Sequence, residues 1–292
     1  MRSLVVGMGF GQLYKDVLLG LGAEVITVDP GRIADFGSVQ AAIERYGQFD
    51  TAHICVPNHL HEQLAREVAP NTKLVFVEKP GLRTAHDWSN LVADFPQTRF
   101  MMVKNNQYRD EIKRFMTLAD QSTSVTILWD NKNRIPNPGS WFTEKSKAFG
   151  GVSRDLIPHM LSYYCALTDW RTGTPQSSMS RQCHELTDIV DSDYGTVNRD
   201  GIYDVDDLCS LEYVTSDNTQ WTLSADWKND HKDDIGISFG AVNNSIRFEL
   251  GLCPESAYDT MITTAWSNID NQEFWNDQLA QDIWIHQQIE NL

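Results

Sequence analysis

Apolar and polar residues alternate in blocks along the first hundred positions. Five short apolar runs have the length of buried strands, and they cover residues 4–6, 24–28, 51–56, 74–77 and 99–103. Between them lie stretches with the apolar spacing of amphipathic helices, at residues 11–21, 39–46, 59–68 and 85–94. Because strands alternate with helices, the fold class is α/β, and we predict a doubly wound parallel sheet.

The pattern changes after residue 104. Strand-like runs follow at residues 124–129, 208–214, 220–226, 235–239 and 245–250, with helices expected near 110–119, 152–167 and 271–289. This pattern predicts a C-terminal α+β domain with a mostly antiparallel open sheet. We therefore expect two domains, 1–104 and 105–292, and leave open whether helix 271–289 packs back on the first domain. The predicted buried face of that helix consists of Phe274, Leu279, Ile283 and Ile289.

A glycine-rich segment follows the first predicted strand, and an acidic residue lies twenty positions after its second glycine. In dinucleotide-binding folds such glycines allow a tight turn and a close approach to a pyrophosphate, and the carboxylate binds the adenosine ribose. The candidate cofactor residues here are Gly7, Gly9, Phe10, Gly11, Gln12 and Asp29. Gln12 stands where a third glycine is expected, so we expect the helix to lie slightly further from the sheet. Asp29 favours NAD over NADP, although Arg32 nearby keeps NADP open.

Two further predicted strands end in polar residues. The first ends in VPNHLH (56–61) and the second in EKP (78–80). Because ligands of open parallel sheets bind at the carboxyl ends of the strands, both segments are candidates for the cofactor crevice. The residues concerned are Val56, Pro57, Asn58, His61, Glu78 and Lys79. An ammonium near a desolvated pocket can donate a proton or polarise a carbonyl, whereas a lysine that simply reaches solvent is the ordinary alternative.

A fourth segment places a carboxylate and an imidazole four residues apart. Asp155 and His159 follow the pair Gly150-Gly151, and a spacing of four puts both side chains on one helix face. Such a pair suits proton transfer near neutral pH. Pro158 is awkward inside a helix, so the first turn is expected to be irregular or the helix to begin later. The alternative is a histidine that only bonds its own turn.

Composition narrows the possible partners. The chain of 292 residues carries 24 basic and 40 acidic residues, a net charge of −16. Such a surface repels nucleic acid and anionic membranes, so we expect neither as a partner. No apolar run reaches the roughly 18 residues of a membrane span. Five scattered cysteines without a CxxC pair predict no disulfide framework and no metal site, and they favour a cytoplasmic location.

These segments together resemble a known family. The Gfo/Idh/MocA oxidoreductases carry, in this order, counterparts of GMGFGQ (7–12), Asp29, VPNHLH (56–61), EKP (78–80) and the GG…D…H run (150–159). The resemblance spans nearly the full length. It implies a Rossmann domain that binds NAD or NADP, joined to a second domain whose open sheet forms a dimer or tetramer. It also implies hydride transfer between nicotinamide and a hydroxyl or carbonyl carbon of a small molecule, a sugar or cyclitol.

The resemblance also assigns roles. Lys79 would contact the substrate hydroxyl and the nicotinamide ribose, His159 would exchange the hydroxyl proton, and Asp155 would position one or both. Asn106 and Arg109, in the segment 104–109, would bind substrate. Two departures are the short stretch between Asp29 and residue 51 and the presence of Pro158. The alternatives are a reductase of a bilin or an imine, with Trp129, Trp141, Trp170 and Trp227 as pocket candidates, and a non-catalytic NAD-binding regulator.

Overall fold

The computed structural model describes residues 1–241 and 244–292, which form two compact units. Unit 1 comprises Met1–Tyr108 and Pro254–Glu290, and unit 2 comprises Arg109–Cys253 with Asn291–Leu292. Residues 254–290, which the sequence analysis placed with the second domain, thus lie in unit 1. Within the described residues no helix is long and apolar enough to cross a membrane.

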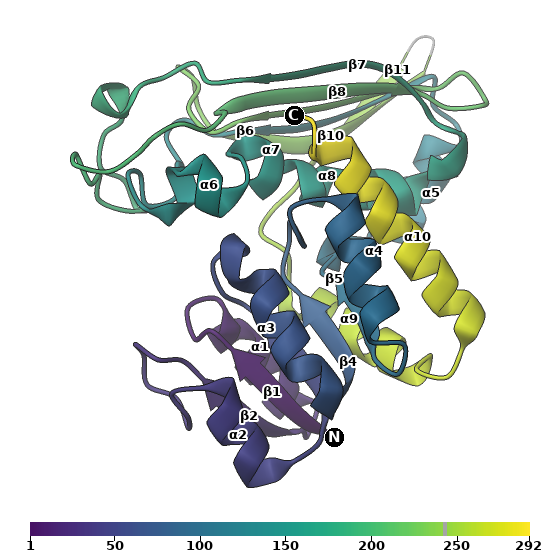
Figure 1. The fold of residues 1–292 in the computed structure, drawn as a ribbon. Coiled ribbons are helices and arrows are strands. Elements are labelled where there is room, and N and C mark those ends of the chain that lie inside the picture. The colour runs from purple at the N-terminus through teal and green to yellow at the C-terminus, as the bar shows by residue number, and fades with distance from the viewer. Residues whose placement is uncertain (242–243) are drawn as a thin grey trace. The chain divides into compact units, whose positions relative to one another are not determined.

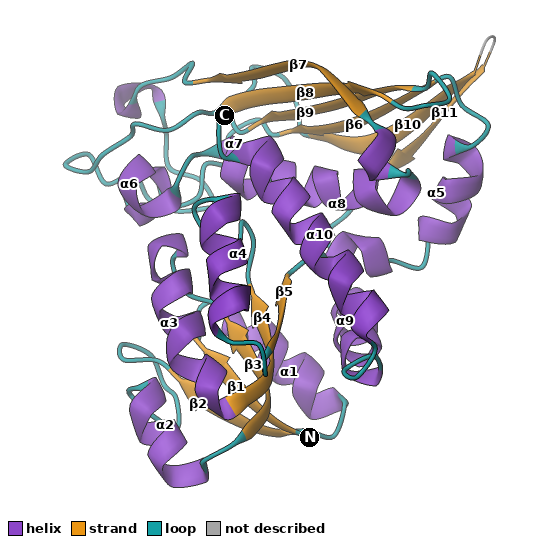
Figure 2. Ribbon diagram, turned by 45° about the vertical axis from the view of Figure 1, so that its right-hand side comes forward, coloured by secondary structure: helices purple, strands orange, loops and turns teal. Residues whose placement is uncertain are grey.

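A parallel sheet forms the centre of unit 1. Its strands are β1 (Arg2–Val6), β2 (Glu24–Val28), β3 (Phe49–Ile54), β4 (Thr72–Val77) and β5 (Arg99–Met102), in the order β2-β1-β3-β4-β5. All neighbouring pairs are parallel, which confirms the doubly wound sheet predicted from the sequence. Figure 2 shows α2 (Val39–Tyr46), α3 (His61–Val68) and α4 (Ala85–Asp94) on one face and α1 (Gly11–Gly20) on the other. The order of strands reverses at β1, where open α/β sheets bind ligands.

The connection between β2 and β3 is short, as the sequence suggested. Only helix α2 lies in it, and a single parallel bridge joins Val28 to Phe36 where a further strand could stand. The backbone N–H of Asp29 donates to Phe36 O at 3.1 Å, and that of Phe36 donates to Thr27 O at 3.1 Å. One strand–helix unit is thus reduced to a bridge, and β2 is the edge of the sheet.

Two C-terminal helices complete unit 1. Helix α9 (Glu255–Ser267), which the sequence pattern did not predict, packs against α1, and α10 (Gln272–Ile289) packs against α4 and β5. The predicted buried face of α10 is wrong at Phe274, Leu279 and Ile283, which are half-exposed, whereas Ile289 is buried as predicted. The other buried residues of this helix are Trp275, Gln278, Gln281, Asp282, Ile285 and His286. Three of these polar side chains have partners elsewhere in unit 1: Asp282 binds Lys104, His286 accepts from the N–H of Leu82, and Gln281 accepts from Gln107.

Unit 2 is built on a six-stranded sheet with the order β11-β10-β6-β9-β8-β7. The strands are β6 (Ser124–Asp130), β7 (Thr174–Arg181), β8 (Leu208–Val214), β9 (Gln220–Asp226), β10 (Asp234–Ala241) and β11 (Asn244–Glu249). Only β6 and β9 pair in parallel, so the mostly antiparallel sheet is confirmed. The edge strand β7 was not predicted, because its residues are nearly all polar and exposed.

The helices of unit 2 cover one face of this sheet. They are α5 (Ile112–Ala119), α6 (Lys145–Ala148), α7 (Val152–Asp155) and α8 (Ile157–Leu167), and Figure 1 shows them on the same side of the strands. The helix predicted over 152–167 is divided at Leu156. Pro158 lies in the first turn of α8, where its missing N–H costs no intrahelical hydrogen bond.

Candidate functional site

The glycine-rich loop joins β1 to α1 and lies against the end of β3. Gly7 has a positive φ of +93°, and a Cβ there would lie 2.4 Å from the carbonyl oxygen of Cys55. Its N–H donates to Val28 O at 2.8 Å. Gly7 therefore links the end of β1 to the ends of β2 and β3, at the point where the order of strands reverses. Gly9 and Phe10 are exposed and accessible to a ligand.

The helix after this loop is not displaced from the sheet. A Cβ on Gly11 would lie 2.8 Å from Cγ1 of Val5, so Gly11 allows the close approach usually given to the third glycine. The expectation drawn from Gln12 is therefore wrong; its exposed side chain bonds Asp16 at 2.9 Å. No side chain caps the N-terminus of α1, which leaves that end suited to a pyrophosphate.

Asp29 follows β2 and binds three backbone N–H groups. Its Oδ2 accepts from Met8 at 2.7 Å, and its Oδ1 accepts from Gly31 and Arg32, each at 2.8 Å. Partial burial acts to raise the pKa of Asp29, but these hydrogen bonds outweigh it and lower the pKa. The carboxylate is thus ionised and fixed beside the glycine-rich loop. Arg32 is close as well, 3.9 Å from where a Cβ of Gly9 would stand.

His61 lies in the interior of unit 1 and does not reach its surface. The ring is fully buried, with Nδ1 2.8 Å from Gly81 O and Nε2 2.9 Å from Val56 O. Burial lowers the pKa of His61 to about 4, so the ring is neutral at pH 7 and donates to only one of these two carbonyl oxygens. The direct cofactor contact predicted for His61 does not fit this position; it joins the 56–61 and 78–82 segments instead. Val56 and Pro57 are half-exposed, and Asn58 is buried.

The EKP segment begins at the end of β4. Glu78 is buried, and its Oε1 accepts from the hydroxyl of Tyr14 at 2.6 Å while its Oε2 accepts from the N–H of Lys79 at 3.1 Å. Burial raises the pKa of Glu78, against the lowering effects of Tyr14 and Lys79. Lys79 itself is half-exposed. Glu78 thus contributes to the shape of the loop, and Lys79 is the residue of this segment with an accessible side chain.

In unit 2, Asp155 ends α7 and His159 lies in the first turn of α8. Both are half-exposed, whereas the residues between them are buried. Asp155 Oδ2 accepts from Nε1 of Trp227 at 3.1 Å, and the ring of His159 stacks on Trp129 at 5.8 Å with an interplanar angle of 27°. The pair therefore shares one face despite Pro158. Because Lys79 belongs to unit 1, its convergence with this pair stays a prediction.

A buried carboxylate that was not among the predicted site residues holds the start of α7, the helix that ends at Asp155. Asp206 accepts from the N–H of Gly151 at 2.8 Å, from the N–H of Ser153 at 2.7 Å and from the Ser153 hydroxyl at 2.9 Å. A Cβ on Gly151 would lie 1.8 Å from the carbonyl oxygen of Asp206, so the glycine is needed for this approach. Asp206 therefore holds the N-terminus of α7. The sequence did contain a signal for Asp206, because residues 206–207 form an acidic pair just before the strand predicted at 208–214.

The two predicted substrate residues of the 104–109 segment are buried. Asn106 lies in unit 1 and is 1% exposed. Arg109 begins unit 2, donates to Gly251 O at 2.6 Å and lies over the ring of Tyr163 at 6.0 Å. A structural role fits both residues better than the predicted contact with substrate, because a buried side chain presents little surface to a ligand.

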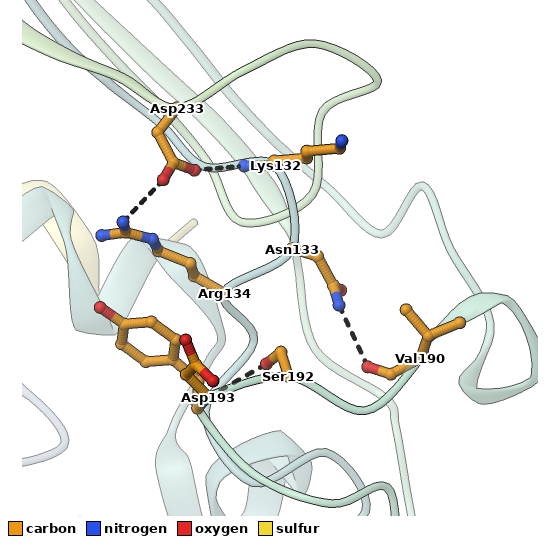
Figure 3. Close-up of a pocket in the computed structure, with 8 residues that line it drawn as sticks. Lys132, Asn133, Arg134, Val190, Ser192, Asp193 and Asp233 are labelled. Atoms are coloured by element: carbon orange, nitrogen blue, oxygen red, sulfur yellow. Dashed lines mark hydrogen bonds and ion pairs between the residues drawn. The ribbon is translucent and has the colours of Figure 1, made fainter.

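A pocket of about 370 Å³ lies elsewhere in unit 2 (Figure 3). It is lined by residues 132–134, 190, 192–194 and 233. The carboxylate of Asp233 binds the Arg134 guanidinium at 2.6 Å and accepts from the N–H of Lys132 at 2.9 Å. None of the predicted site residues lines it. The pocket is therefore separate from the candidate catalytic pair Asp155 and His159.

Comparison with known proteins agrees with the resemblance found in the sequence. Residues 24–104 match the Gfo/Idh/MocA family, described as an oxidoreductase family with an NAD-binding Rossmann fold. Over these residues the chain is similar to the Gfo/Idh/MocA oxidoreductases. The resemblance found in the sequence is thereby confirmed, and the cofactor bound by the Rossmann fold of this family is NAD. The cradle at Gly7, the uncapped α1 and the fixed Asp29 carboxylate fit such a cofactor.

One curated relative of this chain comes from Amycolatopsis mediterranei (strain S699). It is named as a UDP-kanosamine synthase oxidoreductase subunit and is 28% identical over 118 residues. The match covers 39% of this chain and 33% of the relative, so it spans about a third of the relative's length.

Solved structures agree over almost the whole chain. GenD2 from gentamicin A biosynthesis, in complex with NAD, has a TM-score of 0.72 at 16% identity over 98% of this chain and 92% of its own. A protein named as a myo-inositol dehydrogenase from Sinorhizobium meliloti 1021 has a TM-score of 0.73 at 16% identity, covering 98% and 95%. Levoglucosan dehydrogenase with NADH and levoglucosan has a TM-score of 0.67 at 17% identity, covering 85% and 73%. At such low identity the likeness establishes the fold.

Proposed function

We propose that this protein is an NAD(P)-dependent oxidoreductase that transfers hydride between nicotinamide and a carbon bearing a hydroxyl or carbonyl group, in a sugar or cyclitol. The observation that carries the proposal is the half-exposed pair Asp155 and His159, which contact Trp227 and Trp129 respectively. The names of the relatives add support, because they refer to a nucleotide sugar, to inositol and to levoglucosan.

Each of three side chains has a defined task in this proposal. A bound nicotinamide accepts or supplies the hydride. A ring nitrogen of His159 takes the hydroxyl proton during oxidation and returns it during reduction. Asp155, fixed by Trp227, orients the imidazole or a substrate hydroxyl. The ammonium Nζ of Lys79 stabilises the negative charge that develops on the substrate oxygen.

The cofactor preference follows from Asp29. A fixed, ionised carboxylate accepts hydrogen bonds from ribose hydroxyls and repels a 2′-phosphate, so NAD is the preferred cofactor. Arg32, which lies near Gly9, leaves residual use of NADP.

The test is a panel of initial rates followed by absorbance at 340 nm. The panel contains myo-inositol, several aldoses and UDP-glucose with NAD or NADP, and biliverdin and a cyclic imine with NADH or NADPH. We expect turnover with at least one polyol or sugar, and a higher kcat/KM with NAD than with NADP.

Two outcomes of this panel would favour the alternatives. Oxidation of NADH by biliverdin or the imine alone would identify a reductase of a non-sugar acceptor, which the aromatic surroundings of His159 would suit. Binding of NADH by calorimetry without turnover of any compound would identify a non-catalytic regulator.

The open face of the sheet in unit 2 is the proposed interface of a homo-oligomer, a dimer or tetramer. On β6 and β9 the residues of this face, such as Thr126 and Ser224, are small and polar and alternate with buried residues that face the helices. We expect sedimentation to give a dimer or tetramer, and Thr126→Arg to give monomers. A monomeric wild type would contradict this interface.

A cytoplasmic location is also proposed. It rests on the five cysteines, which are all free.

A further inference from the structure

Buried side chains from helices α1, α3 and α10 contact the loop that carries Lys79. It leads from β4 toward α4, and His61 of α3 binds Gly81 O at 2.8 Å. The N–H of Lys79 donates to Glu78, and the N–H of Leu82 donates to Nε2 of His286 at 2.9 Å. The backbone on either side of the Lys79 side chain is therefore held by groups that the proposed mechanism does not use.

On the N-terminal side of Lys79, the loop is supported by helix α1 through Glu78. Tyr14 is fully buried, and its hydroxyl donates to Glu78 Oε1 at 2.6 Å. Its ring packs against His53 at 5.0 Å and Tyr258 at 5.5 Å, which fixes the direction of the hydroxyl. Because Tyr14 occupies one carboxylate oxygen, the other is directed at the N–H of Lys79. Burial raises the pKa of Tyr14, so its hydroxyl keeps its proton and acts as a donor.

On the C-terminal side of Lys79, the loop is supported by His286 of helix α10, which lies 204 residues after Leu82 in the chain. Nδ1 of His286 donates to Asp282 O at 2.6 Å, which leaves Nε2 as the acceptor for the N–H of Leu82. The ring is fully buried and lies against Trp88 at 5.2 Å. Gly81 touches it directly, since a Cβ there would lie 2.4 Å from Nε2. Polar residues on the buried face of α10 thus have a purpose that packing alone does not supply.

We propose that Tyr14, through Glu78, and His286, through Leu82, are positioning residues that set the place of the Lys79 ammonium. The proposal rests on the proposed function, in which Lys79 is the residue that acts on substrate. A displacement of a reacting group by about 1 Å can cost a factor of about 100 in rate, so the effect is expected in kcat rather than in cofactor affinity.

The experiment measures amide hydrogen exchange at residue resolution in the full chain without cofactor. Tyr14→Phe removes only the hydroxyl, and we expect exchange at the Lys79 amide to become about tenfold faster. The matched control is Tyr46→Phe, whose ring contacts Arg2, Phe36 and Phe49 and no residue of the loop. The amide of Glu78, bonded to Ile54 O, is the internal reference that should not change.

A second variant tests the other support. His286→Phe keeps a ring but removes the acceptor, so exchange should become faster at Leu82 before it does at Lys79. If Tyr14→Phe does not fold, this variant decides the proposal. Exchange at Lys79 and Leu82 equal to that of the wild type in the folded variants overturns it.

Kinetics with an active substrate of the panel then separate positioning from mere stability. Tyr14→Phe should lower kcat at least tenfold while the KM for NAD changes less than about threefold. An equal loss through a raised KM for NAD would overturn the positioning role. If the wild type turns over no compound, the proposed function fails, and the exchange measurement still decides whether Tyr14 and His286 hold the loop.

Discussion

Replacement of Lys79 or His159 by alanine should lower kcat by a factor of about 100 to 10,000, the range typical of a lost proton-transfer or charge-stabilising group. Lys79 is half-exposed at the end of β4, and His159 is half-exposed in the first turn of α8. Neither lies in the glycine-rich loop, so binding of NADH should remain within a few-fold of wild type.

The measurement combines initial rates on the panel substrate with a fluorescence titration of NADH. Lys73→Ala and His86→Ala are matched controls, since Lys73 forms a surface ion pair with Asp50 at 2.8 Å and His86 bonds the exposed Asn90. Both controls should keep normal rates. Near-normal turnover in Lys79→Ala and His159→Ala would refute the proposed roles.

Gly7→Ala should be among the most damaging single substitutions in unit 1. Its φ of +93° is disfavoured for alanine, and the new Cβ would lie 2.4 Å from the carbonyl oxygen of Cys55. The end of β3 must then move, and the loop that fits a pyrophosphate moves with it. We expect a loss of about 3 kcal/mol in the free energy of unfolding and at least a tenfold loss of NADH affinity.

Gly22→Ala is the control for the backbone effect. Its φ is +72°, but no atom lies within 4 Å of the added Cβ. Its cost should therefore be only about 1 kcal/mol, with NADH binding unchanged. Urea unfolding and NADH titration of both variants test this, and equal costs for the two would show that contact with Cys55 does not matter.

Much of the architecture could be predicted from the local pattern of apolar and polar residues. The five apolar runs of the first hundred residues became the five parallel strands, because a strand buried on both faces must be apolar along its length. The tight turn assigned to Gly7 fits the structure, since a Cβ there would meet the carbonyl oxygen of Cys55, whereas the close packing of Gly11 against Val5 was not predicted. The polar edge strand β7 escaped prediction, because it buries almost nothing.

The candidate site was only partly predictable. Asp155 and His159 lie in successive helices, α7 and α8, so their placement depends on contacts with Trp227 and Trp129 as well as on their spacing of four residues. Asn106 and Arg109 were assigned to substrate by resemblance, yet both are buried. Asp206 was missed because its partners, Gly151 and Ser153, lie more than fifty residues before it.

The sequence by itself determined the parallel sheet, the glycine-rich loop and the residues that follow the strands, because each depends on neighbours in the chain. Tertiary structure decided that residues 254–290 join unit 1 and that the polar face of α10 is the buried one. The burial of Asp282 and His286 depends on partners such as Lys104 and Leu82, far away in sequence. A hydrophobic pattern reports which residues avoid water, but a polar side chain is buried only where the fold brings it a partner.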